Sequence, residues 1–284
     1  MSKLLTADLG SFNIKTSTGS IYENRFILDN EADIFGAETI TLDNNTYFFG
    51  RGNFDKEFVK TRKEIEVPLL YAVGKEGMEG NINLILHLPT SQFGLKKEIV
   101  ERLQGKTFNY KVNGIDHEVT FDKVGVLKEG FASYYALPKR NNGLVAVVDV
   151  GGRTTDVFTF TEGKEEKETS IPIGTMNYFK DISDKLNLLG ENRKIEDIHK
   201  LIVNDLINLE DFKEITTKVA NDIINEIKID IENLKDYEIK ICGGGSEYFI
   251  KEFEQKFKNV DSIKDSILSN VNGSYFIGKA KGLE

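Results

Sequence analysis

Cysteine is scarce in this chain: Cys242 is the only one among 284 residues, so no disulfide can form within the chain. The three histidines, His87, His117 and His199, stand far apart and lack partners at the spacing of a cysteine–histidine metal site. We therefore expect no such metal site and interpret the histidines as structural residues. Cys242 is interpreted as a small buried apolar residue and not as a nucleophile.

Long apolar runs are also missing. No stretch approaches the roughly 18 apolar residues of a membrane-spanning helix, and the apolar stretch near residues 4–7 is too short for the core of a secretory signal. Hydrophobic residues make up 39% of the chain and charged residues 29%, which is typical of a folded globular protein. We expect a cytoplasmic protein with no membrane partner.

Positive charge is in deficit, with 37 lysines and arginines against 46 aspartates and glutamates and a net charge of −9. Such a balance argues against a broad surface that binds DNA phosphates directly. We expect no direct binding of nucleic acid, so that any DNA-related role would depend on an adaptor protein.

Two familiar glycine-rich nucleotide motifs are absent. The pattern Gly-x-x-x-x-Gly-Lys-Ser/Thr does not occur, which excludes a P-loop, and the pattern Gly-x-Gly-x-x-Gly of dinucleotide-binding folds is not found either. The glycines gather instead in three other turns, each of which follows a strand-like segment.

The first turn follows the apolar residues 4–7 and begins at Asp8, and a second strand-like run covers residues 13–17. Gly10 permits a close approach of the backbone to a phosphate, and successive N–H groups in such a turn bind anions. Asp8 would face a Mg²⁺ ion, through water. An ordinary hairpin turn with an exposed lysine is the alternative for this motif alone. The residues that we expect to bind the nucleotide are Gly10, Ser11, Phe12, Asn13 and Lys15.

The second turn has the same layout, about 140 residues further along. The β-branched run 144–148 ends at Asp149, and a second strand follows at residues 155–160. Asp149 would hold Mg²⁺ or the hydrolytic water. The repeated arrangement predicts two related halves that face one another. The residues expected to bind the nucleotide here are Gly151, Gly152, Arg153 and Thr154.

The third turn lies between a strand at 240–242 and a helix expected at 247–257. A run of glycines lets a flat base or a ribose lie against the backbone, and the start of a helix favours an anion. Alone, such a run is also common loop material. The residues assigned to the nucleotide are Gly243, Gly244, Gly245 and Ser246.

Several further elements follow from the pattern of apolar residues. We expect a strand at 81–88, a hairpin over 105–127 that turns at Asn113-Gly114, and a short helix over 129–137. Apolar residues at helical spacing predict helices over 195–206 and 215–234. The polar stretch 139–143 is the predicted boundary between the halves, and the charged stretch 164–168 is the predicted tip of a hairpin.

The three turns, in this order, resemble the actin/Hsp70/sugar-kinase superfamily. Residues 129–136 and 272–278 resemble its two connecting helices. Within the superfamily, the run Gly-Ser-x-Asn-Ile-Lys at 10–15, the Gly-Gly-x-Thr pattern from Gly151 and Leu-His-Leu-Pro at 86–89 resemble plasmid-segregation actins of the ParM type. The resemblance covers almost the whole chain, although the spacing within 268–278 departs from that of the family.

This resemblance implies an α/β protein with the two-domain actin-like fold and the nucleotide in the interdomain cleft. Domain I would comprise residues 1–142, completed by 271–284, and domain II residues 143–270. ATP or GTP with Mg²⁺ would favour head-to-tail filaments, and hydrolysis would destabilise them. A ParR-like DNA-binding adaptor on the plasmid centromere would connect these filaments to DNA.

The resemblance also implies catalytic roles. Glu129 matches the position that polarises the attacking water, Asp8 and Asp149 would position Mg²⁺, and Asp156 would help to hold the water. Glu129 has an alternative interpretation as an acidic residue that caps the start of a helix.

Other functions of the same fold remain as alternatives. A small-molecule kinase needs a catalytic aspartate on a substrate loop, which the sequence does not display, and an Hsp70-like protein usually has a longer chain. A shape-determining actin of the MreB type usually carries a membrane-inserting apolar element, and none is found. We therefore expect a filament-forming plasmid-segregation actin, with another bacterial or phage actin as the main alternative.

Overall fold

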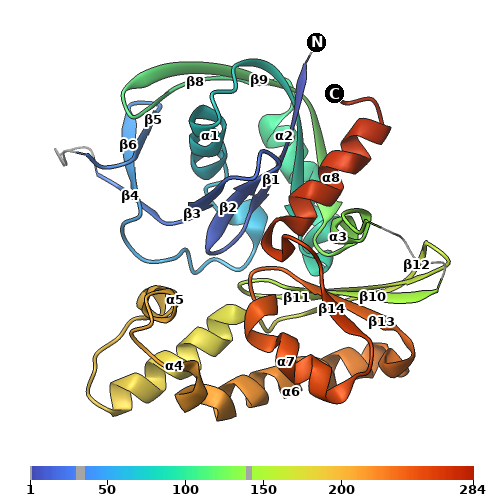
Figure 1. Cartoon of the computed structure of the whole chain (residues 1–284). Coiled ribbons are helices and arrows are strands. Elements are labelled where there is room, and N and C mark those ends of the chain that lie inside the picture. The colour runs from blue at the N-terminus through green and yellow to red at the C-terminus, as the bar shows by residue number, and fades with distance from the viewer. Residues whose placement is uncertain (1, 30–35, 139–142) are drawn as a thin grey trace. The chain divides into compact units, whose positions relative to one another are not determined.

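The computed structural model describes residues 2–29, 36–138 and 143–284. The chain forms two compact units: unit 1 comprises Met1–Ala136 and Asn270–Glu284, and unit 2 comprises Leu137–Ser269 (Figure 1). Most of the polar stretch that we expected as the boundary, residues 139–142, lies outside the described residues.

Unit 1 is built on a nine-stranded sheet within the described residues, in the order β3-β2-β1-β7-β9-β8-β5-β6-β4. Its central strands β1, β7 and β9 run parallel to one another, and β2 pairs antiparallel to β1 and β3 antiparallel to β2. The strands are β1 (Lys3–Leu9), β2 (Asn13–Thr16), β3 (Ile21–Glu23), β4 (Phe26–Leu28), β5 (Thr39–Leu42), β6 (Asn45–Phe49), β7 (Gly80–Leu88), β8 (Thr107–Val112) and β9 (Ile115–Lys128).

Unit 2 contains a five-stranded sheet in the order β12-β11-β10-β13-β14. Its strands are β10 (Leu144–Val150), β11 (Thr155–Thr161), β12 (Lys164–Ile171), β13 (Glu238–Cys242) and β14 (Val260–Ser262). The strands β10, β13 and β14 are parallel, and β11 and β12 are antiparallel to their neighbours. This is the plan of β3-β2-β1-β7-β9 in unit 1, so the prediction of two related halves is confirmed in the topology of the sheets.

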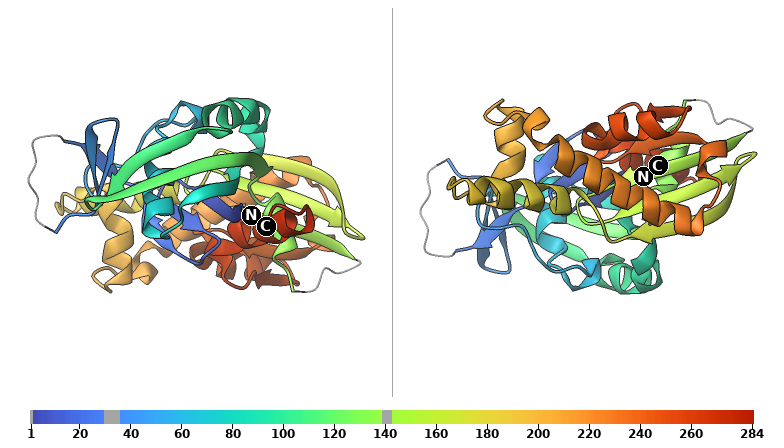
Figure 2. Two further views of the ribbon diagram at one scale, coloured as in Figure 1. Left: turned by 90° about the horizontal axis from the view of Figure 1, so that it is seen from above. Right: turned by 90° about the horizontal axis from the view of Figure 1, so that it is seen from below.

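A long hairpin extends the sheet of unit 1 beyond this common plan. Strands β8 and β9 pair from Thr107 to Val112, and β5, β6 and β4 follow outside β8. The hairpin, in green, is seen clearly in the left view of Figure 2. Asn113 and Gly114 both have positive φ, as a type I′ turn requires, so the predicted Asn-Gly turn is confirmed.

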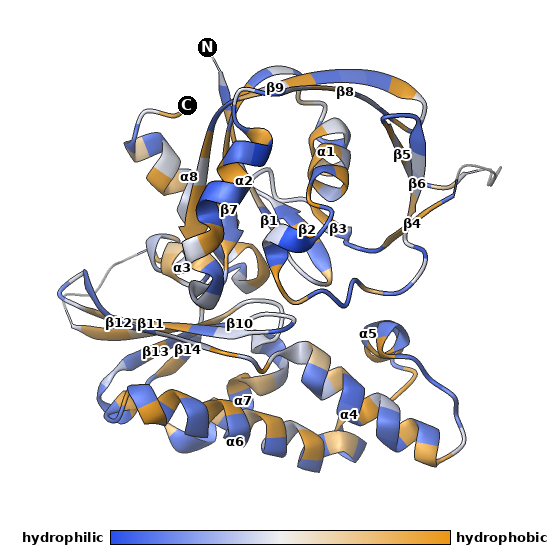
Figure 3. Cartoon of the chain, turned by 180° about the vertical axis from the view of Figure 1, so that it is seen from behind, coloured by the Kyte–Doolittle hydropathy of each residue, from blue (hydrophilic) through white to orange (hydrophobic). Residues whose placement is uncertain are grey.

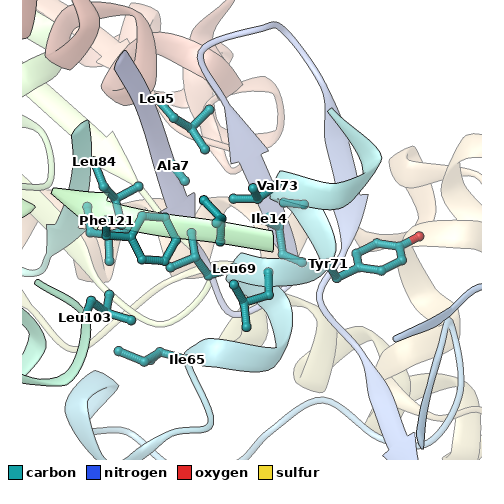
Figure 4. Close-up of a cluster of buried hydrophobic side chains, with 14 of the residues drawn as sticks. Leu5, Ala7, Ile14, Ile65, Leu69, Tyr71, Val73, Leu84, Leu103 and Phe121 are labelled. Atoms are coloured by element: carbon teal, nitrogen blue, oxygen red, sulfur yellow. The ribbon is translucent and has the colours of Figure 1, made fainter. Parts of the chain in front are cut away.

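The core of unit 1 lies between its sheet and helix α1 (Glu66–Lys75). Leu5 and Ala7 of β1 and Ile14 of β2 pack with Leu69 and Val73 of α1, as Figure 4 shows. Each of these side chains is completely buried, and burial of one leucine or isoleucine stabilises a fold by about 1.5–3 kcal/mol. The core therefore fixes the carboxyl end of β1, where Asp8 lies.

Two further helices of unit 1 cross at a glycine. The helices α3 (Phe131–Tyr135) and α8 (Ser269–Ala280) correspond to the connecting helices expected from the sequence. A Cβ atom on Gly273 would stand 1.8 Å from the carbonyl oxygen of Ala132, so only glycine permits this approach. The Asn270 side-chain oxygen accepts hydrogen bonds from the Gly130 N–H group at 2.9 Å and from the Ser133 hydroxyl at 3.0 Å.

We predict that Gly273→Ala destabilises the protein by about 3 kcal/mol or more, because the new methyl group would meet backbone that cannot rotate away. Thermal or denaturant unfolding measures this loss. Gly94→Ala is the matched control, since a Cβ on Gly94 meets no atom within 4 Å, and it should leave the free energy of unfolding nearly unchanged. Equal stability of the two variants would contradict the close helix contact.

Unit 2 has four α-helices within the described residues: α4 (Thr175–Leu188), α5 (Ile195–Val203), α6 (Lys213–Asp230) and α7 (Ser246–Lys256). Polar and apolar residues alternate around these helices in Figure 3, and the orange helix α6 is seen along its length in the right view of Figure 2. Nowhere in the described ranges is a helix both long and apolar enough to cross a membrane.

Three predicted helix boundaries are wrong. The helix expected over 215–234 ends at Asp230, although Ile231 and Leu234 beyond it are buried. The helix expected over 195–206 ends at Val203, and Leu206 is exposed. The helix expected over 129–137 is only the short α3. For α6 the apolar spacing continues past the last helical turn, because Ile231 and Leu234 are buried outside the helix.

The predicted hairpin tip at 164–168 is also wrong. The turn is formed by Glu162 and Gly163, both with positive φ, and residues 164–168 belong to strand β12. β12 stands at the edge of its sheet, and charged residues on an edge strand discourage pairing with other chains.

Candidate functional site

The two aspartate hairpins have the same geometry. Asp8 on β1 pairs with Lys15 on β2, and Asp149 on β10 pairs with Asp156 on β11. In both hairpins the partners are seven positions apart in the sequence. The turns are closed by equivalent hydrogen bonds, from Gly10 N–H to the Asn13 carbonyl at 3.0 Å and from Gly151 N–H to the Thr154 carbonyl at 2.9 Å.

In unit 1, the polar side chains of interest gather at one edge of the sheet. Asp8, His87 and Glu129 lie at or just after the carboxyl ends of the parallel strands β1, β7 and β9. The Glu129 N–H group donates to the Leu88 carbonyl at 2.9 Å, which holds Glu129 beside the end of β7. Ligand sites of open α/β sheets form at this edge.

A chain of alternating charges connects these residues. Lys15 Nζ donates to Asp8 Oδ2 at 2.7 Å, Lys60 Nζ lies 3.4 Å from Asp8 Oδ1, and Lys60 Nζ also forms an ion pair with Glu129 Oε1. Burial would raise the pKa of the Asp8 carboxyl, but the ammonium groups of Lys15 and Lys60 outweigh burial and hold this pKa well below its usual range. Asp8 is therefore an anion at neutral pH.

The histidine at this edge is neutral at physiological pH. Burial lowers the pKa of His87 to about 4, against a smaller opposing effect of Asp8. Its Nδ1 lies 3.1 Å from the Ala7 carbonyl oxygen, and its Nε2 contacts the Ser274 hydroxyl of α8. These contacts connect β7 to β1 and α8, in keeping with the structural role expected for His87.

The first turn is shaped by Asn24, which the sequence motif did not include. The Asn24 side-chain amide donates to the Gly10 carbonyl at 2.7 Å, and its backbone N–H donates to the Phe12 carbonyl at 2.7 Å. Two carbonyls of the turn are thereby directed toward Asn24. The Phe12 ring packs edge-to-face on Phe54 with centroids 4.6 Å apart, and Ser11 is half-buried within the turn.

In unit 2, Asp149 and Asp156 stand opposite each other on adjacent strands. Asp149 is 5% exposed and Asp156 is 1% exposed, and Thr154 Oγ1 donates to Asp156 Oδ2 at 3.0 Å. Opposed residues of antiparallel strands point to the same face, where two like charges repel. A divalent cation relieves this repulsion, so the pair fits a Mg²⁺-dependent site.

The second turn is attached to the start of α4. The carbonyls of Gly151 and Gly152 accept hydrogen bonds from the N–H groups of Thr175 at 3.0 Å and Met176 at 2.8 Å. A Cβ on Gly174 would stand 2.6 Å from the Gly151 carbonyl oxygen. Gly174 is thus a part of this site that the sequence motif did not reveal; Arg153 lies at the outer end of the turn and is half-buried.

The glycines of the third turn have different tasks. A Cβ on Gly243 would stand 2.3 Å from Asp149 Oδ1, and one on Gly245 would stand 2.5 Å from Val150 Cγ1, so both allow the turn to pack on the end of β10. Gly244 has open space, with only Ile267 within 4 Å. The Ser246 hydroxyl donates to the Gly243 carbonyl at 2.9 Å. The nucleotide contact expected at Gly244 stays a prediction.

The donor set also bears on a metal. Within the described ranges, no three histidine, cysteine, aspartate or glutamate side chains gather in a group that could hold a metal ion. Mg²⁺ in nucleotide sites is held by one or two carboxylates together with phosphate oxygens and water. Asp8 and Asp149, each beside a glycine turn, fit that requirement, and both stay predictions as ligands.

The structure thus brings together Asp8, Lys15 and Glu129 in unit 1, and Asp149, Asp156 and the third glycine turn in unit 2. Lys60 is the main residue that the sequence did not indicate. It lies 52 residues from Asp8 and 69 from Glu129 in the chain, and no local pattern marks it.

Comparison with known proteins agrees with this architecture. Residues 147–255 match the family model described as the C-terminal part of archaeal actin homologue MreB-like proteins. No curated protein matches the chain. The crystal structure of Ta0583, an archaeal actin homologue, superimposes with a TM-score of 0.85 at 19% identity and covers 98% of this chain and 99% of its own; the same protein is also known in complex with ADP.

Two further similar structures are filaments. ParM from a 15-stranded Clostridium botulinum filament has a TM-score of 0.79 at 17% identity and covers 99% of this chain and 100% of its own. AlfA from the filament of the B. subtilis plasmid pLS32 has a TM-score of 0.69 at 17% identity and covers 96% and 98%. The predicted actin-like fold and the resemblance to actin-like proteins of the ParM type are therefore confirmed.

Proposed function

We propose that this chain hydrolyses a purine nucleoside triphosphate and assembles with copies of itself into dynamic filaments. The observation that supports this most is the similarity of fold along nearly the whole chain to ParM and AlfA, whose structures are filaments. The repeated aspartate hairpins add chemical support, because an aspartate followed by a glycine turn suits a metal and phosphates.

In this proposal the hairpins act on the same nucleotide. The turn at Gly10 with Lys15, and the turn at Gly151, bind phosphates, while Asp8 and Asp149 hold Mg²⁺. Mg²⁺, when bound, supplies positive charge that stabilises the charge developing on the phosphates. Glu129 orients the attacking water and accepts its proton, and Asp156 assists in holding this water.

We further propose that the filaments separate copies of a plasmid through a DNA-binding adaptor. The motifs of the ParM type support this role, and the net charge of −9 favours an adaptor over direct DNA contact. A different bacterial or phage filament, one that positions or shapes the cell, is the alternative. An adaptor that binds both filament ends and a DNA site would support segregation, whereas filaments that ignore every DNA-binding partner would favour the alternative.

Assembly tests the proposal directly. Purified protein mixed with Mg-ATP or Mg-GTP should scatter more light and then less, as filaments form and hydrolysis weakens them. Pelleting at high speed should recover protein during the rise and less of it after the decay. Failure to assemble over a wide concentration range, together with phosphate transfer to a small molecule, would favour a kinase instead.

We predict that filament assembly depends on exposed apolar side chains at the end of α4 and just after α5. Leu188 is 89% exposed and Leu206 is 68% exposed, and we expect both to be buried against a neighbouring subunit in the filament. The variant Leu188→Glu/Leu206→Glu should raise the concentration needed for assembly at least about tenfold, because burial of each leucine contributes about 1.5–3 kcal/mol. Light scattering at increasing protein concentration measures the concentration at which assembly begins.

The control for this variant is Ile229→Glu, which adds a charge at a similarly exposed apolar residue of α6. It should assemble at the concentration of the unchanged protein. If both variants assembled equally well, Leu188 and Leu206 would not belong to a filament contact.

A further inference from the structure

Lys60 lies outside every nucleotide motif of the sequence, yet its ammonium group stands between two functional carboxylates. Its Nζ is 3.4 Å from Asp8 Oδ1 and forms an ion pair with Glu129 Oε1. The side chains of Lys60 and Glu129 are each 12% exposed, so this ion pair is largely removed from water. Removing two such charges from water costs free energy, which their attraction offsets only if the geometry is good and further hydrogen bonds form.

The backbone around Lys60 is held firmly. The buried Gln92 accepts a hydrogen bond from the Lys60 N–H group at 2.8 Å and donates to the Phe58 carbonyl at 3.0 Å. On the other side, Arg102 donates to the Thr61 carbonyl at 2.7 Å. The short helical turn Lys60–Arg62 therefore presents the ammonium group from a fixed position.

The surroundings of the ammonium group strengthen its electrostatic interactions. Lys60 borders a cavity of about 20 Å³ whose wall is mostly apolar and includes Leu9, Ile65 and Ile99. Electrostatic interactions are stronger in such a medium than in water. Burial alone would lower the pKa of Lys60, but Glu129 and Asp8 raise it above its ordinary value, so the ammonium stays charged at neutral pH.

The position of Lys60 beside Glu129 indicates which phosphate it reaches. Glu129 is proposed to orient the water that attacks the terminal phosphorus, so a cation in contact with Glu129 lies close to the terminal phosphate. Lys15 also binds the Asp8 carboxylate, on Oδ2, whereas Lys60 extends from Asp8 Oδ1 to Glu129. The two lysines are therefore placed for different phosphates.

We propose that Lys60 binds the terminal phosphate of a nucleoside triphosphate and is the residue by which this chain distinguishes a triphosphate from a diphosphate. The inference rests on the proposed function. In the unliganded protein Glu129 and Asp8 hold the ammonium group; when a triphosphate binds, the terminal phosphate oxygens replace Glu129 as its partners. Glu129 is then released to orient water.

Titration calorimetry tests this with Mg-ADP and the non-hydrolysable Mg-AMPPNP, or the guanine equivalents, below the concentration of assembly. Lys60→Met should weaken binding of the triphosphate analogue about tenfold to a hundredfold, because a hydrogen bond to a charged group contributes about 1.5–3 kcal/mol. Its affinity for the diphosphate should change less than about threefold. Lys60→Arg should keep part of the preference, because the positive charge remains.

Lys15→Met is the matched comparison, since it removes an ammonium group from the same aspartate. It should weaken the binding of both nucleotides to a similar degree. If Lys60→Met also weakened the binding of both nucleotides equally, or changed the binding of neither, the inference would be overturned.

Lys60→Met leaves Asp8 and Glu129 without this cation and could unfold the protein, so a second pair of variants is needed. In Glu129→Gln a neutral amide replaces the carboxylate. The double variant Lys60→Met/Glu129→Gln differs from this single variant only at Lys60. The preference for the triphosphate should be present in the single variant and lost in the double variant; equal preferences would overturn the inference. If the unchanged protein bound neither nucleotide, the proposed function itself would fail, whereas normal binding with the same preference in both would refute only the role of Lys60.

Discussion

Glu129→Gln is expected to slow nucleotide hydrolysis about 10²- to 10⁴-fold while filaments still assemble. Glutamine keeps the shape of the side chain and can orient water through its carbonyl oxygen, but it is not a base and cannot accept the proton of the attacking water. In the proposed function, filament growth needs the bound triphosphate and not its cleavage. Light scattering should therefore rise as in the unchanged protein and decay far more slowly, and phosphate release should fall in parallel.

Glu118→Gln is the control, because Glu118 is an exposed carboxylate on the same strand, β9, as the residues that lead to Glu129. This variant should hydrolyse and disassemble at the normal rate. Filaments of Glu129→Gln that decay at the normal rate would remove Glu129 from the chemical step and favour its alternative role at the start of α3.

Asp149→Asn is expected to weaken binding of the Mg-nucleotide at least about a hundredfold, because a buried carboxylate that contacts a divalent cation directly or through water contributes several kcal/mol. Calorimetry with Mg²⁺, and again with a chelator in its place, separates the metal from the nucleotide. The difference between the variant and the unchanged protein should be large with Mg²⁺ and small without it.

The same substitution also tests the repulsion between the neighbouring carboxylates. Asp149 and Asp156 oppose each other on β10 and β11, both buried, so removing one charge should leave the melting temperature of the metal-free protein equal or higher. Asp156→Asn should share this effect on stability, yet keep most of the Mg-nucleotide affinity and slow hydrolysis. An unchanged affinity in Asp149→Asn would exclude Asp149 from the metal site.

The strand–turn–strand units were predictable because their information is local. Each hairpin is a short stretch of chain, from Asp8 to Thr16 in the first and from Asp149 to Thr161 in the second, and the backbone geometry of the turn demands glycine or small polar residues there. The repeat of this pattern then predicted the common plan of the two sheets, which the strand orders confirm.

Lys60 was not predictable because its role depends on tertiary structure. It stands in an irregular segment before α1, and its partners Asp8 and Glu129 come from distant strands. The same holds for Gly174 and Gly273, each of which is required by a backbone brought close from elsewhere in the chain. A lone lysine or glycine gives no sign of such contacts in the sequence.

The strands β3 to β6 also escaped prediction. Each has only three to five residues, and most of their side chains are half-buried, so the alternation of apolar and polar residues is too short to recognise. Their pairing with the long β8–β9 hairpin, rather than their own composition, establishes them as strands.

Unit 1 is discontinuous, and this affects how a nascent chain can fold. Residues 270–284 are synthesised only after all of unit 2, although they complete the fold around β1. Until they emerge from the ribosome, the Thr6 hydroxyl lacks the Val271 carbonyl that it reaches at 2.6 Å, and the Gly130 N–H group lacks Asn270. A partly translated chain can therefore finish unit 2 first, whereas the half that carries Asp8 and Glu129 is completed only by α8.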